Sequence, residues 1–215
     1  MSFLNQLKTQ ASALQTQQVA QAQNLEANTK QTELACQTVA LYLADLAKQL
    51  NVIQPDGPKL SLDGRTPWPE MKLTDFRVDV RKKKLRDRDV CDFIAAGWSI
   101  VPKSGEPATG VVSVNFPPDL ERVETRLRYG GVRFERKDIR QPESNKLQAI
   151  RFEYVAESRG YITVTADHDA AQLHFRLANL GGFDIQHVTW DVARLQSEVL
   201  DELAKMVVGQ PSKFL

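Results

Sequence analysis

The chain has few of the residues from which metal sites and disulfide frameworks are built. It contains two cysteines, Cys36 and Cys91, and three histidines. These residues form neither a CxxC pair nor the spacing of a zinc finger. Two separate thiols are typical of proteins from a reducing compartment. The sequence therefore predicts a cytoplasmic protein with no structural metal and no cofactor.

Long apolar runs are missing as well. No stretch reaches the roughly 20 apolar residues that a bilayer-spanning helix needs, and the start of the chain lacks the basic leader and cleavage site of a secretory signal. Lys and Arg total 28 against 27 Asp and Glu, so the overall charge favours no polyanionic partner. We expect no membrane span, and nucleic-acid binding is disfavoured.

Sequence motifs of nucleophilic and nucleotide chemistry are also lacking, since GxSxG, P-loop, GxGxxG and HExxH patterns do not occur. The triplet Asp167, His168 and Asp169 is the strongest catalytic candidate, because neighbouring carboxylates can raise the pKa of an imidazole. It falls in a predicted hairpin turn, where Asp often bonds its own backbone. Consecutive strand residues point to opposite faces, so the three side chains need not converge. We expect a turn or surface role for the triplet. The sequence therefore favours a protein without enzymatic activity.

Residues 1–50 contain neither proline nor glycine and are rich in Gln, Ala and Leu, a composition that favours helix. Every third and fourth residue from Leu4 onward forms a seam. The two ends of the seam are apolar, but its middle is interrupted by the polar residues Gln18, Gln21, Asn28 and Thr32. A regular coiled coil has apolar residues at such positions. The pattern predicts one long helix, with a helical hairpin broken between residues 15 and 33 as the alternative. The apolar positions of residues 34–50 should pack on the chain's own sheet.

After residue 50 the composition changes, because proline and glycine appear and apolar and polar residues begin to alternate. Residues 51–70 are rich in Pro and Gly and form a predicted linker, in which Trp68 is expected to fill the edge of the core. Residues 71–208 form the predicted α+β domain, in which apolar and polar residues alternate in the manner of strands. Residues 209–215 form the tail, of which 212–215 are expected to be frayed. Expected strands span 71–80, 91–101, 111–116, 132–139, 147–156, 161–166, 173–178 and 183–188, with a tight turn at 158–160, a helix from 117 to 130 and a last helix over 189–207.

This order of elements predicts the fold class. Short turns between strands imply antiparallel pairing. We therefore expect an α+β protein: a long N-terminal helix, then a mostly antiparallel, curved sheet of about seven or eight strands, with one intervening helix and a C-terminal helix packed on one face.

The densest cluster of charge in the sequence is the basic run from Arg81 to Arg88. As a functional site it would contact phosphates. Its other interpretation is a hairpin tip or strand edge, where Lys and Arg keep an exposed edge from pairing with another chain. No aromatic residue lies within the run to stack on bases, and acidic residues flank it. We favour the structural interpretation.

The first functional hypothesis is therefore a non-enzymatic interaction or assembly protein. Its N-terminal helix would pair with a second copy or with a helical protein partner. The partner-binding residues would be the apolar positions of the first turns, which are Phe3, Leu4, Leu7, Ala11 and Leu14.

The alternative hypothesis is a binder of a small apolar ligand, held in a pocket between the sheet and the helices. Aromatic residues of the predicted strands would line that pocket: Trp98, Phe152, Tyr154, Phe175 and Trp190. Ordinary core packing would explain the same residues equally well.

Overall fold

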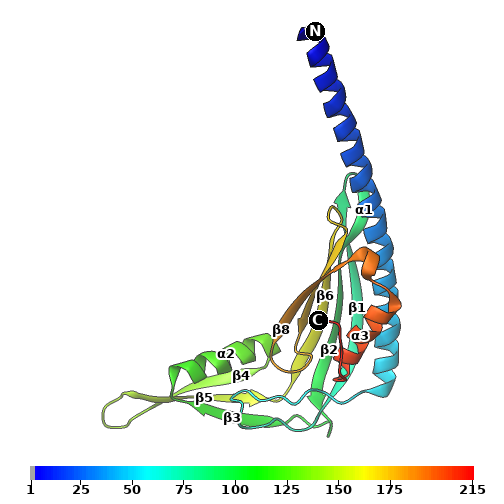
Figure 1. Cartoon of the computed structure of the whole chain (residues 1–215). Coiled ribbons are helices and arrows are strands. Elements are labelled where there is room, and N and C mark those ends of the chain that lie inside the picture. Colours follow the sequence, from blue (N-terminus) through cyan, green and yellow to red (C-terminus); the bar gives the residue numbers. More distant parts are fainter. Residues whose placement is uncertain (1–2) are drawn as a thin grey trace.

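The computed structural model describes residues 3–215, so that the first two residues of the predicted helix lie outside the described part. Within it the chain forms three α-helices, eight strands and one short 3-10 helix (Figure 1). In chain order these are α1 (Phe3–Ile53), β1 (Met71–Leu85), β2 (Arg88–Pro102), β3 (Thr109–Val114), α2 (Pro117–Gly130), β4 (Phe134–Arg140), β5 (Leu147–Val155), β6 (Ser158–Asp167), β7 (Gln172–Ala178), β8 (Ile185–Asp191), η1 (Val192–Arg194) and α3 (Ser197–Val207).

The predicted α+β class is confirmed, and every neighbouring strand pair is antiparallel. The strands divide between two sheets rather than forming one. The larger sheet has the order β1-β2-β6-β7-β8, and the smaller has the order β3-β5-β4. Helices α1 and α3 lie beside the larger sheet, whereas α2 lies with the smaller sheet at the end of the molecule away from the N-terminus (Figure 1).

The predicted turn at 158–160 is wrong, because these residues are the first three of β6. Strand β6 pairs with β2 and β7, whereas β5 pairs with β3 and β4. The Ser158 hydroxyl donates to the carbonyl oxygen of Gly130 at 2.9 Å. At Gly160 a Cβ atom would lie 2.3 Å from the indole of Trp98. Glycine is therefore needed at position 160 for the close approach of Trp98 and not for a turn.

The predicted start of the last helix is also wrong. Thr189 does not cap a helix but lies in β8, opposite His174 of β7, and its hydroxyl bonds the His174 ring at 2.8 Å. Strand β8 continues to Asp191, and α3 begins only at Ser197. Cross-strand pairing thus places residues 189–191, which were expected to begin the helix, in a strand.

Helix α1 runs without a break through residues 15–33 and packs its second half on the larger sheet, chiefly on β1 and β2. Packing of residues 34–50 on the chain's own sheet is therefore confirmed. Not every apolar position of residues 34–50 is covered, because Leu34 and Leu41 are exposed. Its buried residues recur every three or four positions, and they are Thr29, Thr32, Ala35, Cys36, Val39, Leu43, Ala47 and Leu50.

The end of α1 is fixed by a pair of hydrogen bonds to a bulge in β1. The register of β1 against β2 shifts between Thr74 and Arg77, which frees the backbone of Phe76 from the ladder. Asn51 replaces the missing partners, since its Oδ1 accepts from the Phe76 N–H at 2.8 Å and its Nδ2 donates to the Phe76 carbonyl at 2.9 Å. This contact sets where α1 stands along the sheet.

The segment between α1 and β1 is anchored to the domain by three buried side chains, Leu60, Leu62 and Trp68. Trp68 is buried, as predicted, and stacks on Tyr154 with a centroid distance of 5.5 Å, while Phe183 meets it edge-on. No helix described here is both long and apolar enough to cross a membrane.

The last residues contradict the predicted frayed tail. Phe214 is 1% exposed and packs against Phe175 and Trp190, with centroid distances of 5.2 and 5.8 Å. The Ser212 hydroxyl donates to the carbonyl oxygen of Glu202 at 2.7 Å. The tail therefore returns to the core beside α3.

We predict that Phe214→Ala lowers the free energy of unfolding by about 3 kcal/mol, since it removes a buried aromatic ring. Denaturant unfolding measures this change, with Leu215→Ala as the control because Leu215 is 61% exposed. Equal stability of the two variants would show that the tail does not contribute to the core.

Candidate functional site

The first half of α1 extends beyond the domain as a single helix (Figure 1). We call residues 3–25 the rod. Residues 3–24 are exposed throughout, including apolar side chains that a soluble surface seldom groups together. Phe3 is 73% exposed and Leu14 59%. The five residues predicted to bind a partner, Phe3, Leu4, Leu7, Ala11 and Leu14, all lie on this rod.

The apolar face of the rod continues the face that α1 buries in the domain. Positions seven residues apart share nearly the same side of a helix, with a drift of about 20° per heptad. Ala11, Gln18 and Leu25 thus lie in line with Thr32 and Val39, which are both 0% exposed. Leu7 and Leu14 lie at multiples of the same seven-residue spacing from the buried Ala35. One seam therefore runs along the whole helix. It is covered by the domain from residue 29 to residue 50 and is exposed from residue 3 to residue 24.

A pocket of about 270 Å³ lies where the rod leaves the domain. We call it the base pocket. It is formed by about two turns of α1 and by the tip of the β1–β2 hairpin. Its lining residues are Ala22, Leu25, Glu26, Thr29, Leu85, Arg86 and Arg88.

Polar contacts hold the walls of the base pocket. Arg86 donates to the Thr29 hydroxyl at 3.0 Å and forms an ion pair with Asp169. Arg88 pairs with Glu26 at 3.1 Å. With both arginines engaged at its rim, the apolar part of the lining comes from Ala22, Leu25 and Leu85.

Most of the basic run is engaged in ion pairs. The run occupies the end of β1, the edge strand of the larger sheet, and the turn that follows. Its placement confirms the hairpin-tip interpretation. The ion pairs are Arg81 with Asp79, Lys83 with Asp92, Lys84 with Asp89, Arg86 with Asp169 and Arg88 with Glu26.

The triplet Asp167–His168–Asp169 does not converge. The Asp167 carboxylate accepts from the backbone N–H groups of Asp169 and Ala170 at 3.0 and 2.9 Å, and these bonds lower its pKa. The expected turn role is thus confirmed for Asp167. His168 instead points inward and is buried, so a surface role is wrong for this residue. Its Nε2 lies 2.7 Å from the Cys91 carbonyl oxygen.

His168 belongs to a buried polar cluster that joins α1 to β2. Oε1 of Glu33 accepts from the Cys91 N–H at 2.6 Å and lies 3.8 Å from His168 Nε2. Cys36 and Cys91 are both buried and free. The neighbouring Cys91 side chain and burial raise the pKa of the Cys36 thiol, whereas the neighbouring Cys36 side chain lowers the pKa of Cys91. Within residues 3–215 no group of His, Cys, Asp and Glu is arranged to hold a metal ion.

The five aromatic residues of the ligand hypothesis lie in separate contacts. Trp98 stacks on Phe76, and Phe152 meets Phe134 edge-on. Tyr154 stacks on Trp68 in the region of the smaller sheet, whereas Phe175 and Trp190 of the larger sheet meet Phe214. The structure therefore does not bring the five side chains to one place.

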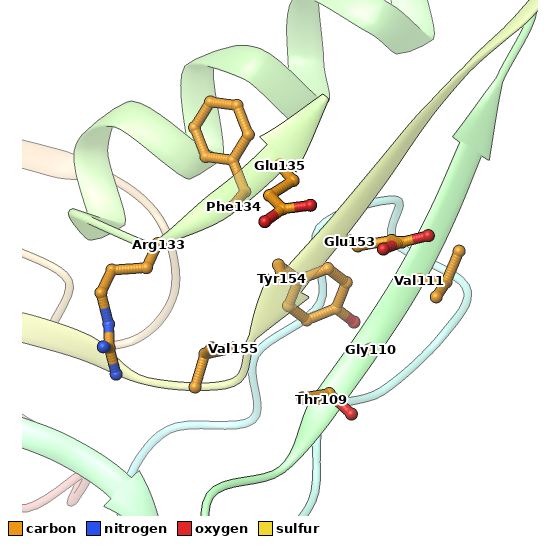
Figure 2. A pocket seen from close by; sticks show the side chains of 9 residues that line it. All are labelled: Thr109, Gly110, Val111, Arg133, Phe134, Glu135, Glu153, Tyr154 and Val155. Atoms are coloured by element: carbon orange, nitrogen blue, oxygen red, sulfur yellow. The ribbon is translucent and has the colours of Figure 1, made fainter. Parts of the chain in front are cut away.

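A hollow of about 560 Å³ lies on the smaller sheet, and Figure 2 shows its lining. Tyr154 crosses above Gly110, where a Cβ atom would lie 2.4 Å from the Tyr154 ring. Glu153 at its margin is neutralised by Lys137 at 2.7 Å, and this contact lowers the pKa of Glu153. The hollow combines two aromatic rings, Phe134 and Tyr154, with charged side chains, and no set of side chains in it resembles a catalytic arrangement.

Comparison of the chain with protein-family models, with curated proteins and with solved structures finds no match.

Sequence reasoning missed the base pocket and the buried cluster. The sequence predictions assign no role to Glu33, and they treat Arg86 as one cation of the basic run. One signal was present: Glu33 lies between Thr32 and Ala35, which α1 buries, and an acidic side chain beside a buried face needs a donor. The donor itself, the backbone of Cys91, lies in another element.

We predict that both thiols of the native chain resist an aromatic disulfide reagent, because Cys36 and Cys91 are each 4% exposed and reactivity requires access to the thiolate. Both should react once the chain is unfolded in guanidinium. Gln15→Cys on the exposed rod provides the control and should react at once. Rapid native labelling of a wild-type thiol would show that the contact between α1 and β2 opens.

Proposed function

We propose that this protein is a non-enzymatic assembly protein, which joins a second copy of itself through the rod of α1. The observation that carries the proposal is the uncovered seam: Leu4, Leu7 and Leu14 are at least 44% exposed although they continue the face that α1 buries elsewhere. In this view the domain is a rigid body carried by the rod, and the rod is a coiled-coil element.

The free energy of helix formation supports this proposal. Isolated helices are marginal in water even when they are rich in alanine, and most helices owe their stability to an apolar face that packs on something. The rod has no such contact in the single chain. Pairing would bury its leucines, at about 2 kcal/mol for each side chain, and would supply the missing stability.

The polar residues of the rod favour a second copy over a charged partner. Lys8 is the only ionisable side chain in residues 3–25, so that the rod offers no charge pattern to select another protein. The seam is completed by glutamines, whose side-chain amide both donates and accepts hydrogen bonds. Such groups are self-complementary, as an interface between identical copies requires. A different helical protein is the alternative partner.

We also propose that the protein acts in the cytoplasm. Support comes from the cysteines, since Cys36 and Cys91 are both buried and form no disulfide bond. Thiols persist in this state in reducing compartments.

The proposal predicts a dimer of twice the 24.2 kDa of one chain, measured by light scattering or sedimentation. The double variant Leu7→Glu with Leu14→Glu should raise the dissociation constant about 1,000-fold or more, because four leucine side chains leave the interface. Glutamate favours helix about as well as leucine does, so the variant should keep the domain and the helix.

The matched control places the same charges, at the same spacing, on the opposite face of the rod: Asn5→Glu with Ser12→Glu. This variant should remain dimeric. A wild-type chain that stays monomeric up to about 100 μM, where specific pairs of micromolar affinity form, would overturn the proposal.

A further inference from the structure

The side of α1 that carries the seam is the side on which the domain lies. From residue 29 onward that side is covered by the larger sheet, since Thr32 and Val39 are 0% exposed. A parallel partner helix in register with the rod would have to run on into this space. The domain therefore blocks parallel pairing along the seam.

An antiparallel partner meets no such obstacle. Its helix would run towards the domain and end there, while its own domain would lie beyond Phe3. The rod of 23 residues, Phe3 to Leu25, is about 34 Å long. Two antiparallel rods can thus overlap over their whole length, and each tip would then reach the other copy where the rod meets the domain.

That place is the base pocket, with its volume of about 270 Å³. Its apolar part consists of Ala22, Leu25 and Leu85. Both of its arginines have partners. Arg86 contacts Thr29 and Asp169, and Arg88 forms an ion pair with Glu26. The tip has matching chemistry, since Phe3 and Leu4 are apolar and no charged side chain precedes Lys8 in the described residues.

We infer that two copies pair antiparallel, so that the apolar tip of each rod, Phe3 and Leu4, inserts into the base pocket of the other copy. The inference rests on the proposed self-association and adds its geometry. Leu14 of one copy lies near Leu14 of the other at the two-fold axis, and the uncharged tip covers the apolar part of the pocket. Contacts of this kind are isologous and close the assembly at two copies.

Spin labels on the full chain distinguish the two arrangements. Both native thiols are 4% exposed, so that unmodified protein is the labelling control. A label at Gln15→Cys lies near the two-fold axis and should give a separation of about 20 Å or less in any paired state. A label at Lys30→Cys should give about 50 Å in the antiparallel pair and close to the interaxial distance of about 10 Å in a parallel pair.

The outcomes separate the two proposals. A short distance at Gln15 with a long one at Lys30 supports antiparallel pairing. Short distances at both positions overturn the antiparallel arrangement but keep self-association. No distance below about 60 Å at Gln15, a length far beyond that of the rod, would mean that the rods do not pair, and would overturn both.

Insertion of the tip has its own test. Phe3→Ala should raise the dissociation constant of the dimer at least about tenfold, whereas Phe3→Leu should keep most of the affinity. Val19→Ala is the control, because Val19 is an exposed apolar residue of the same rod on its flank, away from the seam. If Phe3→Ala dimerises as tightly as Val19→Ala, the tip does not occupy the base pocket.

Discussion

The packing of the second half of α1 on β1 and β2 is the contact on which the rest of the structure depends. It buries Val39 and Leu43 almost completely, and Asn51 fixes its position along the sheet through both backbone groups of Phe76. Because α1 is one continuous helix, whatever holds residues 29–50 also determines the direction of the rod. A helix anchored in this way can present an uncovered face at a fixed angle to its domain.

Polar contacts strengthen this anchor where the rod begins. Glu33, Cys36, Cys91 and His168 join α1 to β2 and to the β6–β7 turn inside the protein, and Arg86 joins the hairpin tip to Thr29 and Asp169. These contacts join side chains and backbone groups of several elements, so they form together only when α1, β2 and the β6–β7 turn lie in this arrangement. The residues that first suggested catalysis or nucleic-acid binding thus hold the rod in place.

The types of the elements could be predicted from local patterns, whereas several boundaries and all of the site geometry could not. Alternation identified most strands, and a glycine-free, proline-free stretch identified α1. Ser158–Gly160 looked like a turn because the space that Gly160 leaves for Trp98 is invisible in the sequence. Phe214 looked like part of a loose end because its contacts, Phe175 and Trp190, lie in two other elements. The base pocket needed the same long-range information, since it joins α1 to the hairpin tip.

The most direct test of the central claim is amide hydrogen exchange of the rod in the wild-type chain and in the variant Leu7→Glu with Leu14→Glu. If pairing stabilises the rod, its amides should be protected in the concentrated wild-type protein and should lose that protection in the variant. The amides of residues 32–50 of α1 should be equally protected in both. Identical exchange of the rod in the two proteins at every concentration would contradict the account, because the rod would then owe nothing to a second copy.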